Sequence, residues 1–323
     1  MSKLKYYTNK YRWELILLLL LIALIVVFGI MNPRFLRLNV LLGSINDFMP
    51  INIISLSVTF VLIAGGMDIQ AGSIVGLTSI SVGLLWQQFG VNIWVASFIG
   101  LIIGGVAGLF SGTIISKLDV QPMVITLGGS FLFSGIALAI LSLSGIETYL
   151  GISGFPESFT SLFRGRVGPV PNQAIIFIIL VIANYILLHK TKYGRKVFLT
   201  GVNRSAAELS GIKTNRIITS TYVLSGISAA LAGIVLTGYL GTAKPDFGKE
   251  LTLPIITAVV LGGTSNTGGR GNILGTAIAS LVIGVLRFGL SMNGVSTQYL
   301  EIPVGILLIV SLIVRMFLDK NKK

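Results

Sequence analysis

The sequence contains no cysteine and little charge. The absence of cysteine from 323 residues excludes disulfides, thiolate metal sites and cysteine nucleophiles. Only 11% of the residues are charged, and the single histidine, His189, ends an apolar run, where we interpret it as an interfacial residue. The sequence also lacks paired carboxylates, closely spaced histidines and a nucleophile next to a base. We therefore expect no metal site, no catalytic site and no cofactor bound by this chain.

Apolar residues dominate what is present. They make up 53% of the chain, and the mean hydropathy is +0.90, far above the usual values for soluble domains. The net charge of +13 is compatible with nucleic-acid binding, but the cationic residues stand at the ends of apolar runs, as in membrane proteins. The composition predicts a membrane protein without a nucleic-acid partner.

Ten apolar segments are candidates for membrane crossing, since a spanning helix needs about 20 mostly apolar residues. The predicted fold is therefore an all-α, polytopic membrane protein that forms a single transmembrane domain over residues 1–323. The eighth segment is too short to span as a simple helix, so it is either extended by its flanks or broken within the membrane. The segments cover residues 14–31, 45–65, 71–89, 93–116, 122–143, 172–189, 217–240, 251–264, 273–292 and 301–318.

Lys and Arg divide unequally between the connections. With the N-terminus placed inside, 17 of the 24 fall on the inner side and six on the outer side, while Arg287 lies within a segment. Cytoplasmic connections carry such an excess. We predict that both termini and the loop 190–216 face the cytoplasm. The longest outer connection, 144–171, has room for a short helix lying on the membrane face, with a plain linker as the alternative.

Glycine is unusually frequent, at 39 residues, and part of it is regularly spaced. Four glycines recur at intervals of four in the fourth segment, which places them on one face of a helix. Small residues at this spacing let membrane helices approach closely. We predict a helix-packing face made of Gly100, Gly104, Gly108 and Gly112.

Two glycine-rich stretches interrupt the apolar pattern and resemble each other. Residues 65–76 (GGMDIQAGSIVG) match residues 262–275 (GGTSNTGGRGNILG), with two extra residues in the second. Both run in the same direction in the predicted topology, so they do not indicate an inverted repeat. Glycine allows the backbone to unwind at such places. The candidates for gating or translocation are Gly65, Gly66, Asp68, Gly72, Ser73, Gly262 and Gly263.

Asp68 is the ionisable residue of the first stretch, and two roles are open for it. Its carboxylate precedes a helical segment, where it can accept backbone N–H groups as a cap. Ionisable groups inside membranes also mark gates and pathways. The other two, Arg287 and Glu301, lie near segment ends. This scarcity argues against an ion-coupled carrier, because such a carrier needs intramembrane carboxylates.

The loop 190–216 is the longest polar stretch, with seven cationic residues and one acid, Glu208. Within it, Asn203 or Ser205 can cap a short helix whose body holds Ala206, Ala207 and Leu209, and Gly211 can end it. The chain has no phosphate-binding G-x-x-x-x-G-K-[ST] motif, so transport energy must come from a partner. The loop is therefore a candidate coupling surface; a polybasic loop that only enforces topology is the alternative.

Three blocks of the sequence carry a resemblance to a known family. The loop contains TKYGR at 191–195 and GVNRSAAELSGI at 201–212, and the second block is GGMDIQAGSIVGL at 65–77, with Met67 and Gln70 as mild departures. The third is TAVVLGGTSNTGGRGNILGT at 257–276. Together they are similar to permease subunits of ribose-type ABC importers. The outer stretches, such as YLGISGFPESFT at 149–160, are most similar to D-type permeases of autoinducer-2 import systems.

The resemblance implies an inner-membrane permease that moves a small polar, sugar-like substrate inward. It implies a second permease subunit, two cytoplasmic ATPase subunits that hold ATP and Mg²⁺, and a soluble binding protein outside. A homodimer that transports ribose or another monosaccharide is the alternative, and a membrane-embedded enzyme is the least favoured. The family's coupling motif falls on Gly194, Arg195, Gly201, Asn203, Ser205, Ala206, Ala207, Leu209, Ser210 and Gly211.

Overall fold

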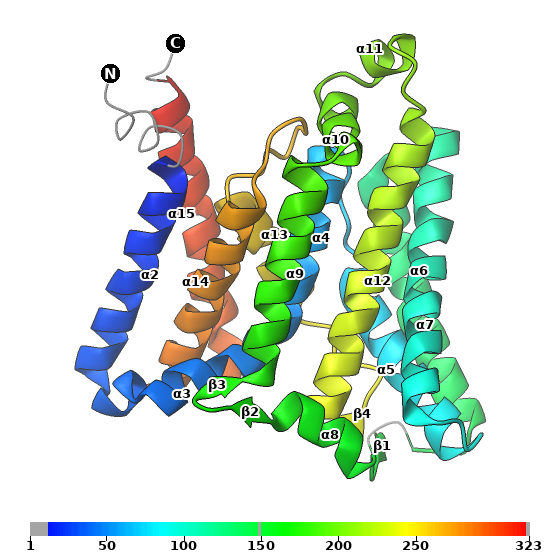
Figure 1. Cartoon of the computed structure of the whole chain (residues 1–323), viewed down its shortest axis with the longest axis vertical. Helices are drawn as coiled ribbons and strands as arrows, with labels where there is room; N and C mark the ends of the chain where they lie inside the picture. The colour runs from blue at the N-terminus through cyan, green and yellow to red at the C-terminus, as the bar shows by residue number, and fades with distance from the viewer. Residues whose placement is uncertain (1–11, 148–149, 321–323) are drawn as a thin grey trace.

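The computed structural model describes residues 12–147 and 150–320, and these are almost entirely helical (Figure 1). Among them, seven helices are long and apolar enough to cross a membrane. The predicted fold class, an all-α polytopic membrane protein, is confirmed. The ten predicted segments correspond to α2 (Arg12–Met31), α4 (Met49–Ile63), α5 (Ala71–Gln87), α6 (Ile93–Leu118), α7 (Pro122–Leu143), α9 (Asn172–His189), α12 (Thr214–Leu240), α13 (Thr252–Leu261), α14 (Ile273–Met292) and α15 (Glu301–Lys320).

The connecting elements divide between two faces of the bundle (Figure 1). One, the loop face, carries the start of α2, the end of α15 and the two helices of the basic loop, α10 (Lys192–Val202) and α11 (Arg204–Leu209). The opposite face carries η1 (Pro33–Leu36), α3 (Leu38–Gly43), η2 (Ser44–Phe48), α8 (Glu157–Arg164) and the strands β1 (Ile152–Ser153), β2 (Arg166–Val167), β3 (Val170–Pro171) and β4 (Thr242–Ala243). A further short helix, η3 (Thr297–Tyr299), precedes α15.

This arrangement puts the basic loop on the same side as both described chain ends, as the cation count predicts. That the loop face is cytoplasmic stays a prediction from the positive-inside rule. Five of the cationic residues counted toward it, Lys3, Lys5, Lys10, Lys322 and Lys323, lie outside the described residues.

Helix α4 forms the centre of the bundle, and α12 lies beside it. All 15 residues of α4 are buried, and α12 contacts α4, α5, α6, α8 and α10. The outer helices α2, α7 and α9 instead expose large aliphatic side chains, for example Leu19, Leu143 and Ile182. Such a distribution suits a bundle surrounded by hydrocarbon rather than by water.

The regularly spaced glycines of α6 lie against two neighbouring helices. A Cβ atom on Gly104, Gly108 or Gly112 would overlap α12, whereas one on Gly100 would meet Val82 and Thr78 of α5. The backbones of α6 and α12 therefore approach closely, because no side chain separates them.

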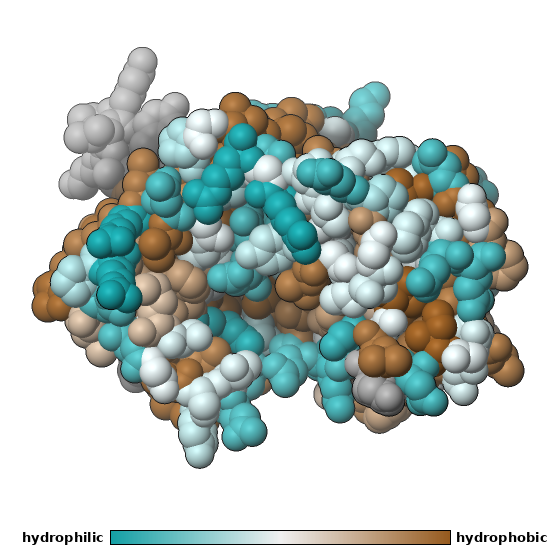
Figure 2. All heavy atoms as spheres, turned by 90° about the horizontal axis from the view of Figure 1, so that it is seen from below, coloured by the Kyte–Doolittle hydropathy of each residue, from teal (hydrophilic) through white to brown (hydrophobic). Residues whose placement is uncertain are grey.

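The outer connection contains the expected short helix, α8, which lies along the opposite face (Figure 1). Its buried side, Phe159 and Phe163, continues an aromatic cluster with Phe155, Trp86 and Trp94. Phe163 also lies where a Cβ on Gly238 of α12 would be. Figure 2, a view onto this face, shows polar side chains over much of it.

Candidate coupling and translocation site

The chain between α4 and α5 is not helical. After Ile63 it turns at Ala64 and Gly65, where Gly65 has φ +86°, and runs to Gln70 before α5 begins. Asp68 lies inside this first break and is only 1% exposed. One of its carboxylate oxygens accepts the backbone N–H of Gln70 at 3.1 Å, and the other accepts the hydroxyl of Ser225 on α12 at 2.6 Å.

Asp68 thus combines a local cap with a tie to another helix. The capping interaction concerns the break itself, since α5 has Gln70 as its N-cap residue without a side-chain bond. The hydrogen bond to Ser225 fixes the break to α12. Both oxygens are occupied, so the carboxylate is a structural part of the break, and its role as a gate stays a prediction.

Two carbonyl groups of the first break accept hydrogen bonds from neighbouring helices. The Met67 carbonyl accepts hydrogen bonds from Tyr222 of α12 and Thr126 of α7, each at 3.2 Å. The Ile69 carbonyl accepts the hydroxyl of Thr252 at 3.3 Å. Non-helical backbone at membrane depth needs such internal partners because lipid offers none.

A second break precedes α13. Residues 244–251 run as turns from β4 on the opposite face to Thr252, where this helix of 10 residues begins. The eighth predicted segment is therefore broken rather than extended. The helix ends at Leu261, whose carbonyl accepts the indole N–H of Trp13 at 2.7 Å.

The two breaks meet inside the bundle. Gly72 in α5 and Gly248 in the second break pack backbone against backbone, and a Cβ on either would overlap the carbonyl of the other. Thr252 lies beside the same contact. From this meeting point α5 runs toward the opposite face and α13 toward the loop face (Figure 1). The N-termini of two short helices thus face each other, an arrangement found at substrate sites of transporters built from broken helices.

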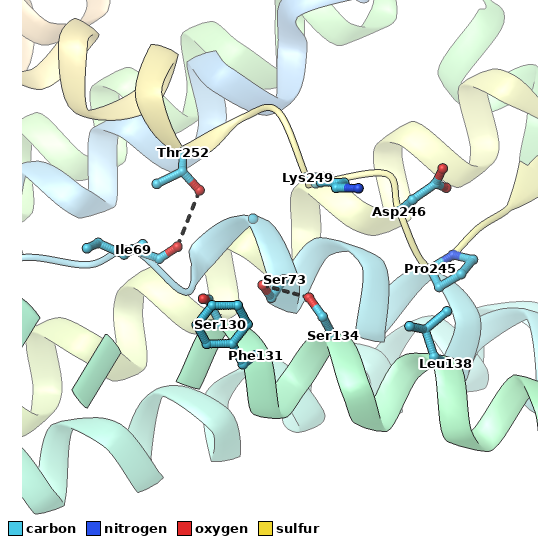
Figure 3. A pocket seen from close by; sticks show the side chains of 12 residues that line it. Ile69, Ser73, Ser130, Phe131, Ser134, Leu138, Pro245, Asp246, Lys249 and Thr252 are labelled. Atoms are coloured by element: carbon cyan, nitrogen blue, oxygen red, sulfur yellow. Dashed lines mark hydrogen bonds between the residues drawn. The ribbon is translucent and has the colours of Figure 1, made fainter. Parts of the chain in front are cut away.

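A cavity of about 470 Å³ opens at this meeting point, between α5, α7 and the second break (Figure 3). Two of the predicted gating residues, Gly72 and Ser73, line it. Gly65 and Gly66 instead line a cavity of about 330 Å³ under the loop helices. Gly262 packs on Thr276, and Gly263 lies next to Trp13. The predicted gating set therefore occupies separate places rather than one site.

The basic loop folds into α10 and α11 as its residues predict. Asn203 is the N-cap of α11, and its side chain accepts the backbone N–H of Ala206 at 2.9 Å. Gly211 follows the helix at φ +80°, and the Ile212 N–H returns to the Ala207 carbonyl at 3.0 Å. This is the left-handed helix ending that favours glycine.

Among the uncharged residues expected in the body of α11, one is buried and the others are exposed. Ser205, Ala206, Leu209 and Ser210 are exposed, and Leu209 is 91% exposed. Ala207 is only 5% exposed and faces the rest of the chain. The side around Leu209 is therefore open to solvent, and Ala207 packs against the rest of the chain.

Helix α10 is seated on the bundle through two glycines. Gly194 lies on the backbone of Leu188, and Gly201 lies between the Ile63 carbonyl and the Gly269 N–H. That carbonyl and that N–H are themselves hydrogen-bonded at 2.8 Å. The three family-like blocks thus meet at one point, where the basic loop touches the end of α4 and the loop between α13 and α14.

Two side chains outside the predicted set also hold the loop helices. The guanidinium of Arg204 contacts Asp119 at 2.5 Å and donates to the Ser116 carbonyl and the Asn215 side chain, joining α11 to α6 and α12. Tyr193 in α10 lies 2.8 Å from Ser220, and burial raises the pKa of its phenol, which therefore remains protonated. The sequence could not predict these two contacts, because each joins residues that lie far apart in the chain.

Sequence comparison assigns the fold to a family. The family described as "Branched-chain amino acid transport system / permease component" matches residues 40–312. The chain belongs to this permease family. It is 43% identical over 306 residues to the autoinducer 2 import system permease protein LsrD of Escherichia coli strain SMS-3-5, covering 95% of this chain and 92% of that protein. The LsrD proteins of Salmonella paratyphi A (41% identical over 307 residues) and Shigella flexneri (43% over 306 residues) match over the same shares of both chains.

The chain is thus a multi-pass membrane permease, and these relatives are named as permease proteins of an import system. Its three glycine-containing blocks are separate in the sequence. In the structure they contribute to two sites of close packing. One is the junction at Gly201 on the loop face, and the other is the meeting point at Gly72 inside the bundle. The first break, residues 64–70, connects them.

Proposed function

We propose that this chain is the permease subunit of an ABC importer that moves a small polar, sugar-like substrate, with autoinducer-2 favoured, inward across the inner membrane. The identity of 43% over 95% of the chain to a relative named for autoinducer 2 import carries this proposal. The two breaks inside the bundle and the packing of α10 on the bundle support a transport role. Ribose or another monosaccharide is the competing substrate.

The loop face is the surface for two ATPase subunits, which hold ATP and Mg²⁺. Leu209 supports this assignment, because a leucine that is 91% exposed on a polar loop calls for an apolar cleft on another protein. The opposite face, with α8, is the surface for a substrate-binding protein. When the ATPases close, α11 moves with them, and α10 carries the displacement through Gly201 to the end of α4 and the first break.

A second, non-identical permease subunit completes the pathway. Ser130 and Ser134 lie in the middle of the 22-residue helix α7 and are only half-buried. Polar groups at this depth face protein or a water-filled path rather than lipid. We therefore place the partner permease beside α7, next to the cavity that Ser130 and Ser134 line.

Uptake by membrane vesicles tests the transport proposal. In vesicles that contain this permease, its partner permease, the ATPase and the binding protein, we expect ATP-dependent accumulation of autoinducer-2, with ribose accumulating at least about tenfold more slowly. Collapse of the proton gradient leaves the rate unchanged. Uptake that requires the proton gradient and not ATP contradicts an ABC importer, and faster ribose uptake contradicts the substrate.

The exposed side of α11 gives a second prediction. Leu209→Asp places a charge where an apolar side chain enters the ATPase, so we expect the amount of ATPase that co-purifies with the permease to fall at least about tenfold. Lys213→Gln, at an exposed position of the same loop, changes the net charge by the same amount as Leu209→Asp and is the matched control; it should lower the co-purifying ATPase less than about twofold. Equal losses in the two variants would show that charge, not the α11 contact, decides docking.

A further inference from the structure

The cavity at the meeting point of the two breaks has an unusual lining for a membrane protein. Four hydroxyl groups, those of Ser73, Ser130, Ser134 and Thr252, face it from α5, α7 and the start of α13 (Figure 3). Asp246 and Lys249 of the second break stand at its edge, and both are exposed. The remaining wall is apolar and includes Ile69, Phe131, Leu138 and Pro245.

The hydroxyl groups of the cavity already make some hydrogen bonds, and the donor and acceptor positions that remain are available to a ligand. Ser134 donates to Ser73 at 3.0 Å, Ser130 donates to the Leu127 carbonyl at 2.7 Å, and Thr252 donates to the Ile69 carbonyl. A serine or threonine hydroxyl has one donor and two acceptor positions. The wall therefore offers several acceptors and one remaining donor, on Ser73. A ligand that fills it must carry both donors and acceptors, as alcohol groups do.

Charge and shape narrow the ligand further. Asp246 and Lys249 have opposite charge, and neither belongs to an ion pair within the described part of the chain, so the edge offers one acceptor and one donor without a net charge. Phe131 and Pro245 provide flat apolar surfaces on which the C–H faces of a small ring can pack. A volume of about 470 Å³ lies within the range of small-molecule sites.

We propose that this cavity, the serine pocket, is a substrate subsite for an uncharged polyhydroxylated molecule held by Ser73, Ser130, Ser134 and Thr252. This rests on the proposed function and names its substrate contacts. The subsite also lies where transport needs one. Ile69 and Gly72 belong to its wall. The first break therefore connects the contact with α10, at its start after Ile63, to the pocket at its other end.

The absence of cysteine from this chain allows a direct test. Ser134→Cys introduces the chain's single thiol, and Ser142→Cys places one on an exposed position of the same helix outside the pocket. In vesicles with the whole importer, the rate of alkylation by N-ethylmaleimide is measured on this chain by mass spectrometry. We expect autoinducer-2 to slow alkylation of Ser134→Cys at least about fivefold and that of Ser142→Cys less than about 1.5-fold.

Uptake kinetics provide the second readout. Alkylation and uptake kinetics together distinguish a failure of the serine pocket from a failure of the proposed transport function. Ser134→Ala should raise KM for uptake about fivefold with kcat within about twofold, since one hydrogen bond to bound substrate is lost. The serine pocket is overturned if autoinducer-2 does not slow alkylation of Ser134→Cys, or if that thiol is not alkylated at all, and the KM of Ser134→Ala is unchanged. In that case, uptake by the wild-type importer still supports the transport proposal. Protection of Ser134→Cys in vesicles whose wild-type form takes up neither autoinducer-2 nor ribose upholds the pocket and overturns the transport proposal.

Discussion

Replacement of Gly201 by valine should reduce ATP-dependent uptake about 100-fold, equivalent to about 2.7 kcal/mol in the transport step. A Cβ atom at this position would overlap the Ile63 carbonyl and would lie 2.7 Å from the Gly269 backbone nitrogen. Both are backbone atoms, so a change of side-chain rotamer cannot relieve the overlap. The loop must lift from the bundle, and the movement of α11 then no longer reaches the first break.

The measurement compares uptake with ATPase binding in the same membranes. Because the exposed side of α11 around Leu209 is unchanged, the Gly201→Val permease should retain at least about half of the co-purifying ATPase. Lys196→Val, an exposed change on the same helix, is the control for β-branched bulk in α10 and should keep uptake within about twofold of wild type. Normal uptake by Gly201→Val would show that the contact is not on the coupling route.

The helices themselves were predictable because hydrophobicity and length decide them in a membrane. Each of the ten apolar segments contains a helix, since a chain in lipid must satisfy its backbone internally. Local rules also predicted the Asn203 cap and the Gly211 ending of α11, because both interactions span only a few residues. The unwinding at Gly65 and Gly66 followed from the same reasoning.

The relation between the breaks was not predictable, because it depends on contacts between distant parts of the chain. The sequence shows that the stretches 65–76 and 262–275 are similar to each other. In the structure, however, Gly72 of the first stretch packs on Gly248, which lies in neither stretch and in none of the three family-like blocks. Likewise, Arg204 reaches Asp119 across 85 positions. The spacing of Ala206 and Ala207 could not tell which of them faces inward, since helix orientation is set by packing on the bundle.

The α6–α12 contact gives the largest expected effect on stability. Gly104 and Gly226 face each other so closely that a Cβ on either would overlap the carbonyl of the other, and Ala230 fills the adjoining space. Leucine at position 104 must separate two long helices. We expect Gly104→Leu to lower the free energy of unfolding in detergent by about 3 kcal/mol or more, the upper range for overpacking, and to reduce recovery of assembled importer.

Gly135→Leu on α7 is the control that separates the effect of a packing clash from the effect of a glycine-to-leucine change itself. No heavy atom lies within 4 Å of a Cβ at this position, so the same substitution adds the same side chain without a clash. Leucine also favours the helix over glycine by about 0.8 kcal/mol, which should leave the control neutral or slightly stabilised in thermal unfolding of the isolated permease. If both variants lose equal stability, added bulk in the membrane is the cause. If only Gly104→Leu loses stability, close backbone contact between α6 and α12 holds the bundle around the first break, and Ser225, the Asp68 partner on α12, depends on it.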